Sequence, residues 1–196
     1  MKIHKINAND ITTNTWSGGT TTQLYIFPEN ADYKKREFDF RISTATVEAE
    51  ESTFTPLPNV ERWLMILDGA ISINHKDHYS KHLEKFDTDH FSGNWETTSR
   101  GRAVDFNLMT TGNLEGNLKA MSLQPKSKTE IAIAKETRYI LFYAYKGGVS
   151  VVINMKETIL NQGDIIAINL DGDLPKVTLE TTEKAEIALA TVHSKV

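Results

Sequence analysis

The sequence predicts an all-β fold made of two stacked β-barrels, and three observations lead to that prediction. Most of the 196 residues fall in short segments in which apolar and polar side chains alternate, the period of a half-buried strand. No stretch of about twelve residues keeps a clean 3.6-residue apolar period, so long helices are not expected. A weak internal repeat also relates the first half of the chain to the second.

The first half contains five expected strands. The first follows the Gly18-Gly19 turn and is rich in threonine and aromatic residues, which suit a pleated sheet. The second alternates, with Phe38, Phe40 and Ile42 on one face. The third is an apolar run that ends at a glycine turn, and the fourth and fifth alternate again. Their ranges are Thr20–Phe27, Phe38–Val47, Arg62–Leu67, Ala70–Asn74 and Ala103–Met109.

The second half contains six expected strands, which are short apolar or β-branched runs between turn residues. Their ranges are Ile131–Ala134, Tyr139–Tyr145, Val149–Asn154, Ile165–Asn169, Lys176–Leu179 and Ala185–Thr191. Strands this dense, with a turn every 8–12 residues, are typical of a sandwich, a jelly roll or a barrel.

The internal repeat favours two barrels. Leu67–Ile73 aligns with Tyr145–Val151, and each copy is a hydrophobic strand, a glycine-centred tight turn and a second alternating strand. Leu160–Ile166 then places a leucine before a Gly-Asp turn and an apolar strand, which is common in cupin jelly rolls. We therefore expect two stacked jelly-roll β-barrels of a cupin-like kind. Residues 1–112 would form the N-terminal barrel and residues 113–196 the C-terminal barrel, with the boundary in the polar segment Thr111–Asn117.

Composition narrows the classes of partner. The formal net charge of -4 gives no general attraction to nucleic-acid backbones or anionic lipid, so neither nucleic acid nor a membrane is an expected partner. The chain has no cysteine, which excludes disulfides, thiolate metal sites and cysteine nucleophiles. The N-terminus lacks the apolar core of a signal peptide, so a cytoplasmic location is expected. The sequence leaves both a monomer and a homodimer open.

The strand Phe38–Val47 carries the first candidate for binding. Its second face begins with Asp39, Arg41 and Ser43 and ends apolar, so a simple solvent-facing strand fits only its first half. A guanidinium has five donors in a fixed fork, which suits a carboxylate or a similar planar anion. We therefore expect Arg41 to line a binding pocket in the N-terminal barrel.

Two further strands carry polar residues of the same kind. Asp105 and Asn107 lie on the face opposite the apolar side of Ala103–Met109, and if buried they need partners, for which Arg41 is a candidate. The alternative is that Asp105 and Arg41 form a structural ion pair or face water. Arg62 heads a strand where it would stand at a barrel mouth, or else it is an ordinary surface arginine.

The segment from Trp16 to Gln23 is a third candidate. Its two glycines allow close approach of the backbone to a ligand, and the following strand places Thr21 and Gln23 on one face. It lacks the lysine of a phosphate-binding P-loop and no βαβ unit accompanies it. The competing interpretation is an entry turn into an edge strand, with threonines present for their β propensity.

The sequence gives little support for a metal site or for a catalytic nucleophile. Four histidines, His75, His78, His82 and His90, lie within sixteen residues, but the paired-histidine spacing of metal-binding cupins is missing. The surrounding charged residues favour a hydrated loop, so we expect no metal and no cofactor. No Gly-x-Ser-x-Gly elbow is present, and no catalytic residue is assigned.

Taken in order, these segments resemble the HutD/Ves family of small bicupin proteins. The resemblance rests on a series of short matches, which are Trp16 with Gly18-Gly19 and Thr21, Phe40–Ser43 with Ala45, Phe54 with Leu57-Pro58, Glu61-Arg62, Leu67–Gly69, Phe91, and Asp105–Met109. It implies a bicupin fold, a pocket in the N-terminal barrel and no tightly bound metal. Gln23 stands where the family commonly has a glutamate, and Thr111 where an arginine often follows.

The resemblance also implies a function. Members linked to histidine utilisation are proposed to regulate by binding an intermediate such as formylglutamate, whereas others are described as linked to stress. Arg41 and Arg62 would hold carboxylates, and Thr21, Gln23, Ser43 and Asn107 would bind a formyl amide. We expect a non-enzymatic binder of a small carboxylate, with Trp16 and Asp105 also at the site. The alternatives are a metal-independent cupin enzyme (isomerase, lyase or hydrolase) with Asp105 or a histidine as general base, and an interaction module that binds another protein.

Overall fold

The computed structural model describes residues 1–195, which form nineteen β-strands and two short 3-10 helices. The chain forms two compact units, each defined by the contacts among its own Cα atoms. The central unit is Thr12–Leu118, and the terminal unit consists of Met1–Ile11 together with the chain from Lys119 onward. The all-β prediction is confirmed, and no helix among the described residues is long and apolar enough to cross a membrane.

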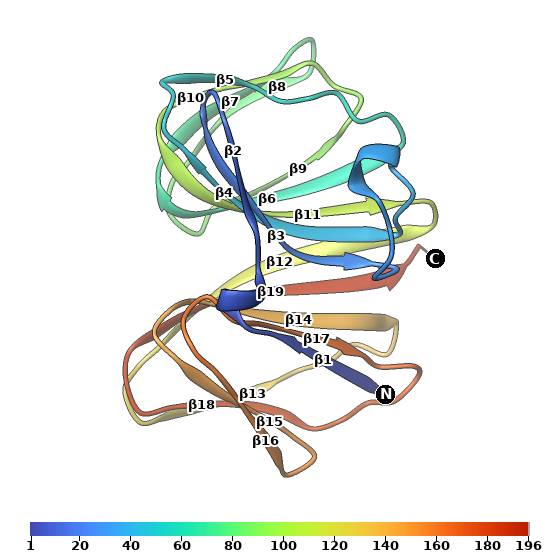
Figure 1. The fold of residues 1–196 in the computed structure, drawn as a ribbon, viewed down its shortest axis with the longest axis vertical. Coiled ribbons are helices and arrows are strands. Elements are labelled where there is room, and N and C mark those ends of the chain that lie inside the picture. Colours follow the sequence, from blue (N-terminus) through green and yellow to red (C-terminus); the bar gives the residue numbers. More distant parts are fainter. Residues whose placement is uncertain (196) are drawn as a thin grey trace. The chain divides into compact units, whose positions relative to one another are not determined.

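The central unit contains two antiparallel sheets (Figure 1). The larger has the order β2-β3-β4-β11-β6-β9, and the smaller has the order β5-β10-β7-β8. Their ranges are β2 Thr13–Trp16, β3 Gly19–Phe27, β4 Phe40–Val47, β5 Glu51–Thr53, β6 Val60–Gly69, β7 Ile71–His75, β8 Tyr79–Leu83, β9 Thr88–Ser92, β10 Thr97–Arg100 and β11 Ala103–Thr111. The 3-10 helix η2, Tyr33–Lys35, lies between β3 and β4.

The core of the central unit lies between its sheets. Leu64 and Ile66 of the larger sheet belong to one buried cluster with Ile71, Ile73 and Leu83 of the smaller sheet. These side chains are apolar at alternate positions, so each sheet buries one face against the other, and this burial is the main favourable contribution to folding.

The terminal unit repeats the same plan. Its sheets have the orders β1-β17-β14-β19-β12 and β13-β18-β15-β16, and residues from both form one core cluster. The ranges are β1 Lys2–Ile6, β12 Leu114–Leu123, β13 Ser127–Ile131, β14 Thr137–Lys146, β15 Val149–Ile153, β16 Lys156–Leu160, β17 Ile165–Asn169, β18 Val177–Thr181 and β19 Ala185–Ser194. The second 3-10 helix, η1, is Ala8–Asp10.

The repeat seen in the sequence corresponds to equivalent turns. Gly69 and Gly147 both have positive φ, 77° and 70°, at the ends of β6 and β14. A Cβ atom at either glycine would lie 2.3 Å or 2.5 Å from a carbonyl oxygen, that of Arg102 or Lys184. Only glycine fits such a turn, because it tolerates positive φ and leaves room for the neighbouring backbone.

Several expectations need correction. The first eleven residues do not lie with residues 12–112, because β1 pairs with β17 in the terminal unit, where Figure 1 shows the two strands side by side. The segment Thr111–Asn117 is not a linker, since β12 begins at Leu114. The strand expected at Ile131–Ala134 is β13, which ends at Ile131. The other expected strands coincide closely with observed ones, and the sequence missed β1, β2, β5, β8, β9, β10, β12 and β16.

Candidate functional site

Backbone pairing in the larger sheet of the central unit brings the seven expected site residues of β3, β4, β6 and β11 to one face. β11 lies between β4 and β6, and Met109 pairs with both Arg41 and Arg62. One row further along, Asn107 pairs with Ser43, which also pairs with Gln23 of β3. Residues opposite one another in a sheet project to the same side. Asp105, two positions from Asn107, therefore joins this face as well.

Both faces of β4 are buried at its first four residues, so Arg41 does not face water. Phe40 and Ile42 are fully buried on one side, and on the other Arg41 is 5% and Ser43 2% exposed. Arg62 is also buried, at 6%, so the surface alternative for this arginine is wrong.

Arg41 is fixed by two polar neighbours and one aromatic ring. Its Nε donates to Gln23 Oε1 at 2.8 Å, and its Nη1 donates to Ser43 Oγ at 2.9 Å. The guanidinium carbon lies 4.1 Å from the ring centre of Tyr33, a cation–π contact. A glutamate at position 23 would accept the same hydrogen bond from Arg41 Nε, but Gln23 is neutral and does not offset the charge of the arginine.

Arg62 is less completely satisfied. Its Nη2 donates to Asn107 Oδ1 over a long 3.5 Å, and its buried Nε has no hydrogen-bond partner among the described residues. The guanidinium lies over the rings of Phe54 and Phe91, 4.8 Å and 5.2 Å from their centres. A buried donor without an acceptor is unfavourable, and a bound acceptor would relieve that.

Asp105 is the carboxyl group that acts to raise the pKa of Arg62, and its side-chain hydrogen-bond partner is Asn107, not the candidate Arg41. Burial raises the pKa of Asp105 to about 7, against the opposing effects of Arg62, the Ala45 amide and Asn107. Asp105 is therefore largely neutral below pH 7.

Burial lowers the pKa of both arginines. Desolvation lowers the pKa of Arg62 to about 10, and it also lowers the pKa of Arg41. Tyr33 acts on both groups in the opposite direction, and Arg41 contributes to lowering the pKa of Arg62, so the three side chains are electrostatic neighbours. Within residues 1–195 neither guanidinium has a carboxylate within ion-pair distance. The positive charges of Arg41 and Arg62 are therefore buried without a neutralising partner.

Thr21 and Trp16 occupy the periphery of the face. Thr21 is half-buried and pairs with Ala45, in the row of Asp105. Trp16 ends β2, is 41% exposed and covers Gly18, where a Cβ atom would lie 2.1 Å from the indole ring. Trp16 therefore packs on its own turn and is not placed among the arginines.

The sequence interpretation missed three aromatic residues at the cluster. Phe54 and Phe91 were noted only as part of the family resemblance, and their rings meet edge-on at 5.9 Å. Tyr33 lies in the polar segment Asp32–Lys35, where neither alternation nor a motif singles it out.

The histidine segment is hydrated, as the sequence predicted, at His78, His82 and His90, which are exposed, but not at His75. His75 is 1% exposed, its Nε2 pairs with Asp89 Oδ2 at 2.9 Å and its Nδ1 with Thr97 Oγ1 at 2.8 Å. Tyr79 binds the other oxygen of Asp89, and this hydrogen bond together with burial raises the tyrosine pKa to about 12. Within residues 1–195 no group of three His, Asp or Glu side chains is placed to hold a metal ion.

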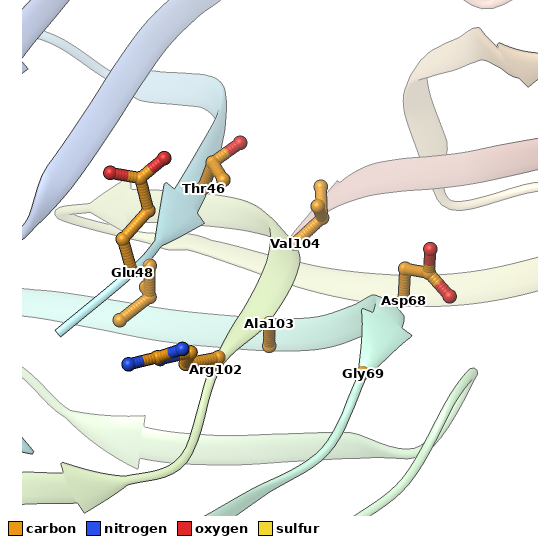
Figure 2. A pocket seen from close by; sticks show the side chains of 8 residues that line it. Thr46, Glu48, Asp68, Gly69, Arg102, Ala103 and Val104 are labelled. Carbon is orange, nitrogen blue, oxygen red and sulfur yellow. The ribbon is translucent and has the colours of Figure 1, made fainter. Parts of the chain in front are cut away.

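A surface depression in the central unit lies away from the arginine cluster. Figure 2 shows its lining, in which Glu48, Asp68 and Arg102 carry the charges. These groups come from the ends of β4 and β6 and from the start of β11, and the charged side chains spread apart rather than converge. None of the eight expected site residues lines it. The depression therefore offers no concentrated site for an anion.

Comparison with solved structures supports a cupin-like all-β fold. A conserved protein of unknown function from Pseudomonas aeruginosa PAO1 matches with a TM-score of 0.84 at 19% identity, over 99% of this chain and 100% of that one. HutD from Pseudomonas fluorescens SBW25 matches with a TM-score of 0.73 at 16% identity over all of both chains. The Escherichia coli pirin YhhW, solved with nickel(II), has a TM-score of 0.73 at 13% identity, also over both whole chains.

At these identities the structural likeness shows the fold alone. No curated protein matches the chain significantly in sequence. The sequence model of the HutD family, however, matches residues 8–189, nearly the whole chain. This protein therefore belongs to the HutD family.

Proposed function

We propose that this protein is a bicupin that binds a small carboxylate metabolite, such as formylglutamate, without catalysis and in a regulatory role. The observation that carries the proposal is the pair of buried guanidiniums, Arg41 and Arg62, on one face of one sheet. A bicupin is supported by the equivalent glycine turns of the two units, which fit a duplicated module.

The electrostatics favour an anionic ligand. Two cations face one acidic group, Asp105, whose pKa of about 7 leaves it largely neutral in mildly acidic solution. A carboxylate that enters would neutralise buried positive charge and accept from the free Nε of Arg62. Charged hydrogen bonds of this kind are about twice as strong as neutral ones.

The remaining polar groups suit an amide on the same ligand. Asn107, Ser43 and Gln23 offer both donors and acceptors beside the arginines, and Thr21 lies at the edge of the face. Formylglutamate carries two carboxylates and a formyl amide, which matches two cations and neighbouring neutral polar groups. Formate is a useful minimal probe, because the P. fluorescens HutD structure is described for a formate condition.

Thermal-shift and calorimetric titrations with formylglutamate, glutamate, urocanate, simple sugar acids and formate test this function. A ligand at 100 times its Kd stabilises the native state by about 2.7 kcal/mol, which gives a clear rise in Tm. Arg62→Lys keeps the charge but loses the fork, and should reduce the shift. Arg100→Ala, at an exposed arginine, is the matched control and should leave it unchanged.

Two outcomes would contradict the proposal. If no carboxylate shifts the melting temperature, the cluster does not act as an anion site. If Arg62→Lys and Arg41→Ala both retain the full shift, the ligand binds elsewhere. Binding should also weaken as the pH rises through about 7, because ionised Asp105 then repels the ligand and competes for Arg62.

A metal-independent enzyme is the second candidate, and the raised pKa of Asp105 is the observation that favours it. A carboxyl group that titrates near pH 7 is suited to general acid–base catalysis on a small acid. Turnover of one of the same acids, lost in Asp105→Asn with binding retained, would establish this role. Binding without turnover across the panel would leave the non-enzymatic function.

A further inference from the structure

The proposed binding site is closed, and this raises the question of how a ligand enters. Arg41, Ser43, Arg62 and Asn107 are each no more than 6% exposed. A metabolite can reach these groups only if a neighbouring segment moves. The inference below rests on the proposed function, because it concerns access to the same cluster.

The connection between β3 and β4 is the segment that touches Arg41 from outside the sheet. The connection runs from residue 28 to residue 39, and its part 28–37 carries η2, with the ring of Tyr33 placed 4.1 Å from the Arg41 guanidinium. Tyr33 also acts on the pKa of Arg62, so it stands near both cations. Figure 1 shows this connection as the loop that carries the lighter of the two blue helical turns.

Residues 32–36 are held in their turn by hydrogen bonds among themselves. The Lys34 amide donates to Asp32 Oδ1, and the Lys35 and Arg36 amides donate to the carbonyls of Asp32 and Tyr33. No residue of η2 is buried. The turn can therefore move as a piece while these bonds stay intact, which is typical of segments that open locally.

The ends of the segment are anchored in the sheet. The Asp39 amide donates to the Phe27 carbonyl at 2.8 Å, and Thr111 Oγ1 donates to the Phe38 carbonyl at 2.5 Å. These bonds fix where the chain leaves and re-enters the sheet. Movement of the part between them is therefore hinged at both ends.

The other aromatic neighbours of the arginines are less able to move. Phe91 lies within β9, is 2% exposed and belongs to the core cluster. Phe54 is tied by its amide to the Thr97 carbonyl at 2.9 Å. Tyr33 is partly buried at the edge of a core cluster and lies outside the strands, so it is the ring that can leave the arginines with the least disruption of backbone pairing.

We propose that residues 28–37 form a movable cover over the Arg41–Arg62 cluster, with Tyr33 as the gate. In the closed state the tyrosine ring occupies the face of the Arg41 guanidinium. Opening exposes Arg41 to a carboxylate, and reclosing excludes water around the bound anion, which strengthens its contacts with the arginines.

Chemical modification of arginine by phenylglyoxal tests the cover without any metabolite. Sites are identified by peptide mass spectrometry in the folded protein. Arg41 should react at least about tenfold more slowly than Arg100, because a local opening must precede its reaction. Arg100 is a suitable reference, since its side chain is 77% exposed.

Two variants at one position separate the ring from its hydroxyl. Tyr33→Ala should raise the rate at Arg41 severalfold while the rate at Arg100 stays the same, and urea unfolding of the variant checks that its fold is intact. Tyr33→Phe keeps the ring and should react like the unaltered protein. Arg41 reacting as fast as Arg100 in the unaltered protein, or an unchanged Arg41 rate in Tyr33→Ala, would overturn the proposal.

Hydrogen exchange in the unaltered protein tests the movement itself. Amides of residues 33–37 should exchange through openings that leave the amides of β4 protected. Exchange of both groups at one common rate would overturn the proposal, because the segment would then open only with the sheet. Neither experiment depends on a ligand, so a failure of carboxylate binding and a failure of the cover are distinguishable.

Discussion

Replacing Asp105 with asparagine should remove a pH dependence from the stability of the protein. The pKa of this carboxyl group is raised from its ordinary value of 3.8 to about 7 by burial. Between these two values the native state holds a proton that the unfolded chain has released. Stability therefore falls as the pH rises through this window and is level above it.

The size of the effect follows from the two pKa values. Each pH unit of difference corresponds to about 1.4 kcal/mol, so the interval from 3.8 to about 7 gives about 4 kcal/mol. Asparagine has nearly the same shape and can still accept from Asn107, but it does not titrate. Between pH 4 and pH 8 the unaltered protein should thus lose about 4 kcal/mol more stability than Asp105→Asn.

Urea unfolding at a series of pH values from 4 to 8 measures this difference. Asp164, whose pKa is lowered, changes stability in the opposite direction, but it is present in both proteins and cancels. Asp77→Asn makes the same chemical change at an exposed turn and should follow the unaltered protein. Parallel curves for Asp105→Asn and the unaltered protein would refute the reasoning, because Asp105 would then not titrate near pH 7.

Three other substitutions test separate features. Gly69→Ala forces a Cβ atom to within 2.3 Å of a carbonyl oxygen and should cost about 3 kcal/mol, whereas Gly112→Ala, in open space at a similar φ, should cost about 1 kcal/mol. Equal losses on urea unfolding would contradict this. His75→Gln should lower stability by about 3 kcal/mol, because buried Asp89 loses a partner; a loss below about 1 kcal/mol in thermal melts would argue against that role. Arg41→Lys should weaken carboxylate binding about tenfold by calorimetry, since an ammonium lacks the fork, and unchanged affinity would disprove it.

Alternation explains why part of the fold was readable from the sequence. Strands such as β4, β6 and β11 bury at least one face, and burial demands apolar residues at every second position. The missed strands β2 and β8 are almost wholly exposed, and their backbone pairing with β3 and β7 defines them. Such pairing leaves little trace in side-chain type.

Part of the candidate site could likewise be predicted from the sequence, and part could not. Arg41, Ser43 and Asn107 could be placed on one face because each interrupts an otherwise apolar strand at the right period. The burial of His75 could not be predicted, because its partners Asp89 and Thr97 lie on other strands and its chain neighbours are charged. Local polarity in the sequence does not show whether distant residues will enclose a side chain.

The pairing of β1 with β17 has a consequence for the order in which the chain can fold. The central unit is one continuous stretch, so all its strands are available once residue 118 has been synthesised. β1 is made first, yet its partner residues 165–169 arrive more than a hundred and fifty positions later. Until then its backbone groups are unpaired, and closing so long a loop is slow. The first strand made should therefore be among the last to be incorporated, and a nascent chain stalled before β17 should leave it open to proteolysis.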